Sequence, residues 1–375
     1  MKKKLKIALF ISPDPSKPGG VQEHSYFLAK SLIKLGHHVS TFGPKPTKRY
    51  PNYVRVGDSI AMPMPNGEWA DFNFWSGKKP SEIINRGNFD ICHIQEPLIP
   101  FINWELFKNV LPPKVVTFHF AWDKDSVGNI LKPILPHFKK TFSSYVSGAI
   151  FVSRLTQKRM KTLCKRSIPQ QVILNGLDHT VYFPPVKKIV TKKIQILFLA
   201  RLIPKKGPFY LIKAFNWLKT DFPNLRVVFI GEGSEKNRVA RFVQNHNLSA
   251  KVTFKGVVSE AEKRNYYQNS DIFCAPYVDE GYGLTVLESM ACGCPFVGFK
   301  NDAFKQWLKA YPRPELLVKP KDWVSLTKAL KVLITNTDLR SKLSAWCVKE
   351  SQKYNWDETA KQTEQFYYKV LAKNK

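Results

Sequence analysis

Short β-rich runs alternate with helical patterns along the whole chain, and this alternation limits the folds that the sequence can adopt. In the first half, the β-rich runs are 7–11, 39–42, 90–94, 115–118, 149–153 and 172–174. A second set follows a stretch rich in proline and lysine at 184–193, and its members are 194–200, 226–230, 252–254, 272–275 and 296–298. Such alternation is typical of parallel sheets wound with helices. We therefore expect an α/β protein with two doubly wound, Rossmann-like domains.

The length of the chain also favours two domains. At 375 residues the chain exceeds what one hydrophobic core usually serves, and 43% of its residues are hydrophobic, which is enough for two cores. We place the boundary in the proline- and lysine-rich stretch, with a first domain over 1–185 and a second over 186–354. Ligands of doubly wound sheets bind beyond the carboxyl ends of the strands. We therefore expect a site built from the loops of both domains.

Positive charge is in excess in both halves of the sequence. The formal net charge is +30, with 28 basic against 12 acidic residues up to residue 190 and 31 against 17 beyond it. A surface of this kind attracts polyanions, which means nucleic acid or the anionic face of a membrane. The sequence has no zinc-finger spacing, no Gly–aromatic RNA-binding signature and no basic heptad region. Nucleic acid is thus the minor alternative, and we expect no nucleic-acid partner.

Two features favour a protein of the cytoplasm. No apolar run approaches the ~18 residues of a membrane-spanning helix, and the run 7–11 is too short for the core of a signal peptide. The six cysteines show no Cys-x-x-Cys spacing, and most lie in apolar surroundings, as reduced and packed thiols do. We interpret Cys292-Gly-Cys294 as a tight helix end, with a metal or redox pair as the alternative.

The segment Glu280-Gly-Tyr-Gly-Leu-Thr-Val-Leu-Glu288 places two carboxylates on either side of a glycine-bearing turn and a short apolar helix. Gly281 and Gly283 allow the backbone to approach a ligand, and a helix over 284–292 would direct unpaired N–H groups at a phosphate. Glu280 is then placed to accept hydrogen bonds from sugar hydroxyls, and Glu288 to reach a ribose. The segment suits a nucleotide sugar, and the alternative is a turn and an amphipathic helix with two solvated acids.

Three further sites follow predicted strands. Gly19 and Gly20 lie between the first strand and a helix, where they can seat a phosphate, although a plain turn is the alternative. His119 ends a strand of the first domain, and the alternative for it is a packed or surface histidine. Arg201 and Lys206 follow the first strand of the second domain, where two cations can stabilise a nucleoside diphosphate leaving group. The alternative is that both are solvated surface charges, and we favour the diphosphate site.

Over essentially the whole chain the sequence resembles the family-four retaining glycosyltransferases, which have the GT-B fold. Its closest form within that family is the phosphatidylinositol mannosyltransferases. The resemblance lies in short stretches from both domains: Pro18-Gly-Gly-Val-Gln22, Leu35-Gly-His-His-Val-Ser40, Pro51-Asn-Tyr-Val54, Phe89-Asp-Ile-Cys-His-Ile-Gln-Glu-Pro97, Thr117-Phe-His119, Asn175-Gly-Leu-Asp178, Cys274-Ala-Pro276, the Glu280 to Glu288 segment and Asn301-Asp-Ala-Phe304. Tyr354-Asn-Trp356 resembles the point where the last helix, 355–375, crosses back to the first domain.

The resemblance implies a role for each matching residue. Glu280 would contact the transferred sugar, and Glu288 would contact the ribose. His119 would lie beside the sugar and the acceptor. By this resemblance, the catalytic residues of the protein would be His119, Glu280, Arg201 and Lys206. Its donor-binding residues would be Gly19, Gly20, Arg201, Lys206, Glu280, Gly281, Tyr282, Gly283, Leu284 and Glu288. Its acceptor-binding residues would be Gln22, Asn66 and Lys124, each of which is also an ordinary loop residue. No metal or other cofactor is expected, because the two cations neutralise the diphosphate.

The resemblance further implies a retaining hexosyltransferase, a monomer held peripherally at the inner face of the membrane. Mannose from GDP-mannose is the expected donor, and a lipid-anchored molecule is the expected acceptor. Phe120 stands where the phosphatidylinositol enzymes carry threonine, and Asp71 where a basic residue is expected to meet the inositol phosphate, so inositol is in doubt. The alternatives are transfer from a UDP- or ADP-sugar to a soluble sugar or polysaccharide, and a basic nucleotide-sugar- or nucleic-acid-binding protein without catalysis.

The segment from Trp69 to Lys79 is the best candidate for contact with an anionic membrane. Four aromatic residues precede two lysines there, in a stretch without the alternation of a buried strand. Aromatic side chains with lysine suit a lipid headgroup layer. The alternative is that the aromatic residues pack on the core of the first domain and the lysines are solvated.

Overall fold

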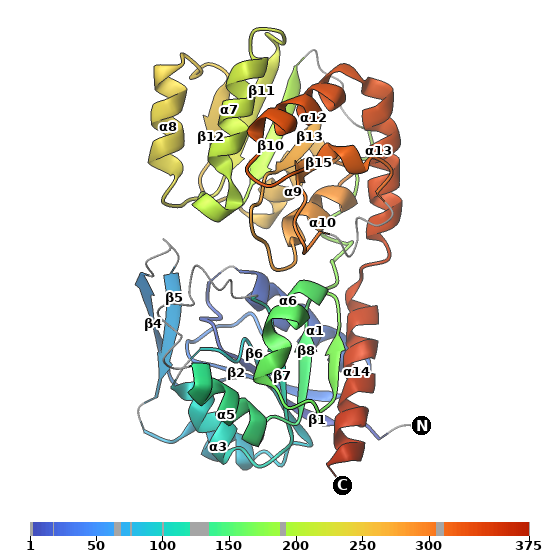
Figure 1. The fold of residues 1–375 in the computed structure, drawn as a ribbon. Coiled ribbons are helices and arrows are strands. Elements are labelled where there is room, and N and C mark those ends of the chain that lie inside the picture. Colours follow the sequence, from blue (N-terminus) through green and yellow to red (C-terminus); the bar gives the residue numbers. More distant parts are fainter. Residues whose placement is uncertain are drawn as a thin grey trace. The chain divides into compact units, whose positions relative to one another are not determined.

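The computed structural model describes residues 3–17, 19–63, 69–75, 77–99, 101–120, 135–187, 193–304 and 311–374. The chain divides into two compact units (Figure 1). Unit 1 comprises Met1–Gly176 and Trp356–Lys375, and unit 2 comprises Leu177–Asn355. The chain therefore passes from unit 1 to unit 2 after Gly176, whereas the predicted boundary lies at 185/186.

Unit 1 contains a seven-stranded sheet in the order β3-β2-β1-β6-β7-β8-β9, with every neighbouring pair parallel. Its strands are β1 (Lys6–Ile11), β2 (His38–Gly43), β3 (Tyr53–Arg55), β6 (Ile91–Gln95), β7 (Lys114–Phe118), β8 (Gly148–Phe151) and β9 (Gln170–Val172). From β1 the chain builds outward to β3 and then returns to the other side of β1 with β6. The order of the strands thus reverses between β1 and β6, and ligands of such sheets bind at this point of reversal.

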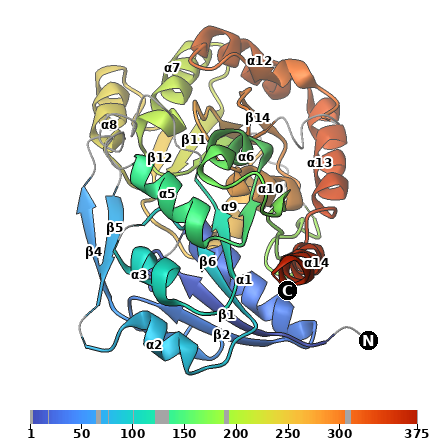
Figure 2. The same ribbon diagram turned by 60° about the horizontal axis from the view of Figure 1, so that its bottom comes forward.

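Helices cover both faces of this sheet (Figure 2). They are α1 (Gly20–Lys34), α2 (Pro80–Asn85), α3 (Ile102–Asn109), α5 (Leu135–Tyr145), α6 (Arg154–Met160) and α14 (Trp356–Lys373). One apolar core joins α1 and α14 to the sheet, and another joins α2, α3 and α5 to its opposite face. A Cβ atom on Gly148 of β8 would lie 2.6 Å from Val370 Cγ2, so the close packing of α14 requires glycine there.

A two-stranded antiparallel sheet, β4 (Asp58–Pro63) with β5 (Trp69–Phe74), accompanies unit 1. The predicted membrane segment therefore contains a strand, although its sequence shows no buried-strand alternation. The polar Asn73 is fully buried and donates a hydrogen bond to the carbonyl of Ser12, whereas Phe74 is 41% exposed. A half-buried strand usually points its apolar residues inward and its polar residues outward. At these two positions of β5 the polar residue points inward and the aromatic residue outward. Trp75 packs against the core of unit 1, in line with the alternative of folded aromatic residues.

Unit 2 contains a six-stranded parallel sheet in the order β12-β11-β10-β13-β14-β15. Its strands are β10 (Ile194–Leu199), β11 (Leu225–Ile230), β12 (Val252–Phe254), β13 (Ile272–Ala275), β14 (Phe296–Phe299) and β15 (Leu317–Val318). Its helices are α7 (Pro208–Leu218), α8 (Lys236–Asn245), α9 (Glu260–Asn269), α10 (Leu284–Ala291), α12 (Trp323–Thr335) and α13 (Thr337–Ser351). The order of the strands reverses between β10 and β13, so a second ligand position lies beyond these two strands. The expected doubly wound α/β architecture is confirmed in both units.

None of the helices in the described ranges is both long enough and apolar enough to cross a lipid bilayer.

Candidate functional site

His119 lies directly beyond the carboxyl end of β7, as predicted. Its side chain is 8% exposed, and its Nε2 lies 2.8 Å from Oε1 of Gln95, the last residue of the neighbouring strand β6. Burial lowers the pKa of His119 well below 6.5, so the imidazole is neutral at pH 7. A neutral imidazole has one donor and one acceptor, and the amide oxygen of Gln95 takes the donor. The proton is therefore on Nε2, and Nδ1 carries the lone pair.

A buried polar network continues from Gln95 into unit 1. The Gln95 amide nitrogen lies 3.0 Å from Nε2 of His93, which also receives the Thr117 hydroxyl at 2.7 Å. Nδ1 of His93 lies 2.6 Å from the hydroxyl of Tyr367 on α14. Burial lowers the pKa of His93 as well, so its ring is neutral. With the proton on Nδ1 it donates to Tyr367, and the Thr117 hydroxyl and the Gln95 amide share the one lone pair of Nε2. The network thus connects the last helix of the chain to the orientation of His119.

Glu96 fixes the backbone that carries His119. It has a left-handed φ of 55° and is 2% exposed, and its Oε2 accepts hydrogen bonds from the backbone N–H groups of His119 at 3.1 Å and Phe120 at 3.2 Å. Burial raises the pKa of Glu96 to about 8 against the opposing effect of these N–H donors. Glu96 was given no role from the sequence, where its signal is an acidic residue immediately after a buried strand.

His24 of α1 lies against the ring of His119. The two ring centroids are 4.6 Å apart at an interplanar angle of 78°, and the ring of Trp356 contacts His24 from 5.3 Å. His24 Nδ1 lies 2.9 Å from Oδ1 of Asn175, while its buried Nε2 has no hydrogen-bond partner among the described residues. Burial lowers the pKa of His24 to about 4. Its neutral ring therefore provides a rigid, uncharged wall for His119.

The glycine pair precedes and begins α1. A Cβ atom on Gly19 would lie 2.3 Å from Oε1 of Gln22, so the end of the Gln22 side chain lies close against the Gly19 backbone. Gln22 is 7% exposed and its amide nitrogen donates to the carbonyl of Asp14 at 3.0 Å. Gln22 thus supports the loop. Helix α1 begins at Gly20, and the N–H groups of its first turn have no partner within the helix. The other two predicted acceptor residues, Asn66 and Lys124, lie outside the described residues.

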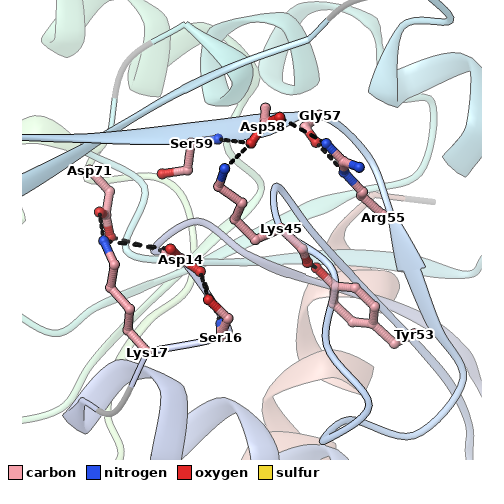
Figure 3. A network of polar contacts seen from close by, with 10 residues as sticks. All are labelled: Asp14, Ser16, Lys17, Lys45, Tyr53, Arg55, Gly57, Asp58, Ser59 and Asp71. Carbon is pink, nitrogen blue, oxygen red and sulfur yellow. Dashed lines mark hydrogen bonds and ion pairs between the residues drawn. The ribbon is translucent and has the colours of Figure 1, made fainter.

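Asp71 ties β5 to the same loop (Figure 3). Its Oδ2 accepts a hydrogen bond from the backbone N–H of Asp14 at 3.0 Å, and Lys17 Nζ lies 3.2 Å from its Oδ1 and 3.5 Å from Oδ2 of Asp14. Nearby, Asp58 of β4 forms ion pairs with Lys45 and Arg55. The residue that replaces the expected basic side chain therefore acts within the framework of unit 1.

Lys206 and Glu280 form a part-buried ion pair in unit 2. Lys206 ends a short 3₁₀ turn before Gly207, whose left-handed φ of 66° begins α7. A Cβ atom on Gly207 would lie 2.2 Å from the carbonyl oxygen of Pro276, so this close approach requires glycine. The Lys206 ammonium also lies 4.7 Å from the centroid of the Tyr277 ring. The carboxyl ends of β10 and β13 thereby bring together a cation and a carboxylate that are 74 residues apart in sequence.

The two charges affect each other's protonation. Burial lowers the pKa of Lys206, and the charge of Glu280 opposes this shift. Burial alone would raise the pKa of Glu280, but Lys206 and Lys205 outweigh it and hold the carboxyl below its usual range. Arg201, exposed beyond the end of β10, adds to the positive potential at Lys206. The Glu280 carboxyl is therefore ionised at neutral pH, and the basic side chains around it form a positive field suited to a diphosphate.

The glycine-bearing turn leads into α10 as predicted. Gly283 has a left-handed φ of 92° immediately before Leu284, and the N–H of Gly281 donates to Oε1 of Glu280 at 2.9 Å. Tyr282 between them is buried. The turn therefore orients the Glu280 carboxylate and leaves the first N–H groups of α10 without intrahelical partners.

Glu288 is 7% exposed on α10 and has two partners from α9. The Tyr267 hydroxyl donates to its Oε2 at 2.8 Å, and Lys263 Nζ lies 3.2 Å from its Oε1. Burial raises the pKa of Glu288 against the opposing charge of Lys263. Neither Lys263 nor Tyr267 was predicted, because a carboxylate and its partners on another helix share no local sequence pattern.

A second glycine loop, also not predicted, follows β11. Gly231 and Gly233 have φ values of 123° and 154°, and a Cβ atom on Gly233 would lie 2.4 Å from the carbonyl oxygen of Leu202. The N–H of Leu202 in turn donates to the carbonyl of Glu232 at 2.9 Å. This loop therefore lies against the backbone beside Arg201, and the Gly-x-Gly pattern after a strand is the signal that could have revealed it.

Known protein families and individual relatives match this chain along most of its length. Residues 18–181 match the family model of Glycosyltransferase Family 4, and residues 183–346 match that of Glycosyl transferases group 1. A phosphatidyl-myo-inositol mannosyltransferase of Mycolicibacterium smegmatis is 30% identical over 94% of this chain and 91% of its own length. The enzyme of the same name from Mycobacterium tuberculosis strain H37Rv is 28% identical over 95% of this chain and 94% of its own length.

Solved structures agree on the fold. Sucrose-phosphate synthase from Thermosynechococcus elongatus superimposes with a TM-score of 0.78 at 19% identity, over 99% of this chain and 100% of its own. HepE of Anabaena, in complex with UDP and glucose, has a TM-score of 0.78 at 15% identity, over 96% of this chain and 98% of its own. With both halves matched by glycosyltransferase families and a relative at 30% identity along most of its length, the chain belongs to the family-four glycosyltransferases and has the GT-B fold.

Proposed function

We propose that the protein transfers a mannosyl unit from GDP-mannose to a lipid-anchored acceptor at the cytoplasmic face of a membrane, with retention at the anomeric carbon. The observation that carries the proposal is the Lys206–Glu280 pair between the glycine-opened starts of α7 and α10. This pair supplies a cation for a diphosphate and a carboxylate for sugar hydroxyls in one place. The choice of mannose and of a lipid rests on the relatives named phosphatidyl-myo-inositol mannosyltransferase.

In the proposed reaction, the bond from the anomeric carbon to the diphosphate oxygen breaks and its electron pair leaves with the nucleoside diphosphate. An acceptor hydroxyl oxygen bonds to the same face of the sugar, and its proton passes to the departing diphosphate. Lys206 and Arg201 stabilise the charge that grows on the leaving group, so no metal ion is needed. Glu280 orients the sugar, Glu288 holds the ribose, and the neutral His119 of unit 1 accepts a hydrogen bond through Nδ1.

Donor identity is tested by the thermal stability of the purified protein with GDP-mannose, UDP-glucose and ADP-glucose. A ligand at a hundred times its dissociation constant adds ~2.7 kcal/mol to the unfolding free energy, so only the true donor class should stabilise strongly. Stabilisation by the UDP- or ADP-sugar alone would contradict the choice of GDP-mannose.

Transfer is tested with radiolabelled GDP-mannose and total bacterial lipid in vesicles, with and without excess EDTA. We expect label in the lipid fraction, an α-linked product by NMR, and the same rate with EDTA. Glu280→Gln, which keeps the size of the side chain but removes its charge, should bind the donor and transfer at least ~10² times more slowly. Label only in soluble sugars would support the soluble-acceptor alternative, and a strict need for Mg²⁺ would contradict the metal-free mechanism.

A further inference from the structure

Exposed apolar side chains gather on the outer surface of α7 and α12 in unit 2. Trp217 of α7 is 69% exposed, and Val324 of α12 is 49% exposed. The two helices lie side by side (Figure 1, Figure 2), and the ring centroids of Trp217 and Trp323 are 6.2 Å apart. An exposed tryptophan that clusters with a second aromatic ring and a valine is a feature of binding surfaces more than of a solvated helix.

Packing within unit 2 does not account for this cluster. Helix α7 is attached by Leu211 and Phe215, and helix α12 by Leu326 and Leu330, all of which have no exposed surface. These residues point to the opposite side of the helices from Trp217, because a solvated face and a core face alternate with the helical period. Polar residues on the outer face would leave the hydrophobic core of unit 2 unchanged. The apolar residues there are therefore better explained by contact with a binding partner.

Lysines lie around the exposed Trp217 and the half-buried Trp323. Lys213 Nζ lies 4.5 Å from the centroid of the Trp323 ring. Lys328 and Lys331, both exposed, follow Val324 by four and seven positions and so share its face of α12. Lys331 also pairs with Asp221 at 2.9 Å. We call Lys213, Trp217, Trp323, Val324, Lys328 and Lys331 the Trp217 surface.

The chemistry of the Trp217 surface fits a lipid headgroup layer. Tryptophan prefers the boundary between headgroups and acyl chains, where its ring is shielded and its N–H can still donate. Lysine side chains extend their apolar stems along such a boundary and place the ammonium at lipid phosphates. The net charge of +30 favours an anionic layer over a neutral one. A second copy of the chain could cover the same apolar side chains, and the tests below separate a dimer from a lipid layer.

We infer that unit 2 contacts an anionic membrane through the Trp217 surface. This inference deepens the proposed function, since it rests on an acceptor that is anchored in lipid. It also differs from the predicted contact through the Trp69 to Lys79 segment, which belongs to unit 1.

The first experiment measures sedimentation of the full-length protein with vesicles of phosphatidylcholine, with or without phosphatidylglycerol, at low salt. The protein should sediment with the anionic vesicles and be released as salt is raised, because the Debye length falls to ~3 Å at 1 M. The variant Lys328→Gln with Lys331→Gln should lower the partition coefficient roughly tenfold. The matched control is Lys342→Gln with Lys349→Gln on α13, which removes the same charge from two other exposed lysines and should change the coefficient by about twofold or less.

The second experiment locates the contact. Tryptophan fluorescence should be quenched by anionic vesicles whose lipids carry bromine on the acyl chains. Trp217→Phe keeps an aromatic ring and should remove most of this quenching while leaving the far-UV circular dichroism unchanged.

Both lysine variants losing affinity equally, or quenching that persists in Trp217→Phe, would overturn the inference. So would sedimentation that is equal with neutral and anionic vesicles, or a dimer in light scattering that Trp217→Ser converts to a monomer. Because these assays contain neither donor nor acceptor, their failure leaves the proposed transfer untouched. Failure of transfer with intact sedimentation would instead refute the proposed function alone.

Discussion

Replacing Gln95 with methionine tests whether the buried network orients His119. Methionine has nearly the same length but can neither accept from His119 Nε2 at 2.8 Å nor donate to His93 Nε2 at 3.0 Å. The Thr117 hydroxyl still reaches His93 Nε2, so only the Nε2–H of His119 is left without a partner. One unsatisfied buried polar group costs ~1–3 kcal/mol, and the unfolding free energy should fall by that amount. Loss of the bond that fixes the proton on Nε2 also lets the other tautomer compete. Because that bond contributes ~1–3 kcal/mol in a buried site, kcat should fall by about ten- to a hundredfold.

The assay is mannosyl transfer at saturating donor and acceptor, with ¹⁵N NMR of the histidine rings and urea denaturation alongside. The matched control is Thr117→Val, which removes the 2.7 Å contact to His93 in the same network but leaves His119 bound to Gln95. The control should lose stability without a change in kcat or in the His119 tautomer. An unchanged kcat in Gln95→Met, despite lower stability, would refute the positioning role and leave Gln95 with a structural one.

Further predictions concern the charges of both units. Burial raises the native pKa of Glu96 to about 8, whereas the unfolded carboxyl titrates near ~4.3, so the native state binds the extra proton between these values. The unfolding free energy of the wild type should therefore fall with rising pH across this window, by up to about 5 kcal/mol relative to Glu96→Gln, in urea titrations. Lys263→Met leaves Glu288 buried without its cation and should cost about 3–5 kcal/mol in unfolding free energy and raise the KM for the donor; an unchanged KM would remove Glu288 from the ribose site. Arg201→Ala and Lys206→Ala should each lower kcat by ~10² with the fold preserved by circular dichroism, and wild-type turnover in the double variant would exclude the diphosphate role.

The architecture was predictable because strands β1, β2, β6 and β7 in unit 1 are short runs rich in β-branched and aromatic residues, within a residue or two of the predicted ranges. Fully buried parallel strands need such runs, so composition alone locates them. The two-residue strand β15 (Leu317–Val318) was beyond prediction, because two apolar residues carry no period. Strand β5 was missed for a different reason, since its buried Asn73 makes a specific hydrogen bond that no hydropathy pattern encodes.

The candidate site was predictable only where a glycine or charge pattern is local. Gly283 and Glu280 stand in one short segment, and the structure gives Gly283 the left-handed backbone that the pattern demands. The network of Gln95 and His93 was not foreseen, because its third member Tyr367 is 274 residues from His93. Polar side chains that are satisfied by such distant partners look like ordinary buried strand residues in the sequence.

Asp71 illustrates how the structure changes the meaning of a substitution. From the sequence, an acid in place of a base at this position argues against an acceptor that carries a phosphate. In the structure both oxygens of Asp71 are engaged, one by the backbone N–H of Asp14 and one by Lys17, which is itself 47% exposed. The carboxylate is thus partly neutralised, and a cation still reaches the surface beside the glycine loop. Because Lys17 has a mobile point charge where a guanidinium would offer a fixed fork, the proposed acceptor site would have less geometric selectivity for one phosphate but would keep an attraction to anions. Under the proposed function, the substitution would therefore change which acceptor headgroups unit 1 distinguishes more than whether an anionic lipid can bind there.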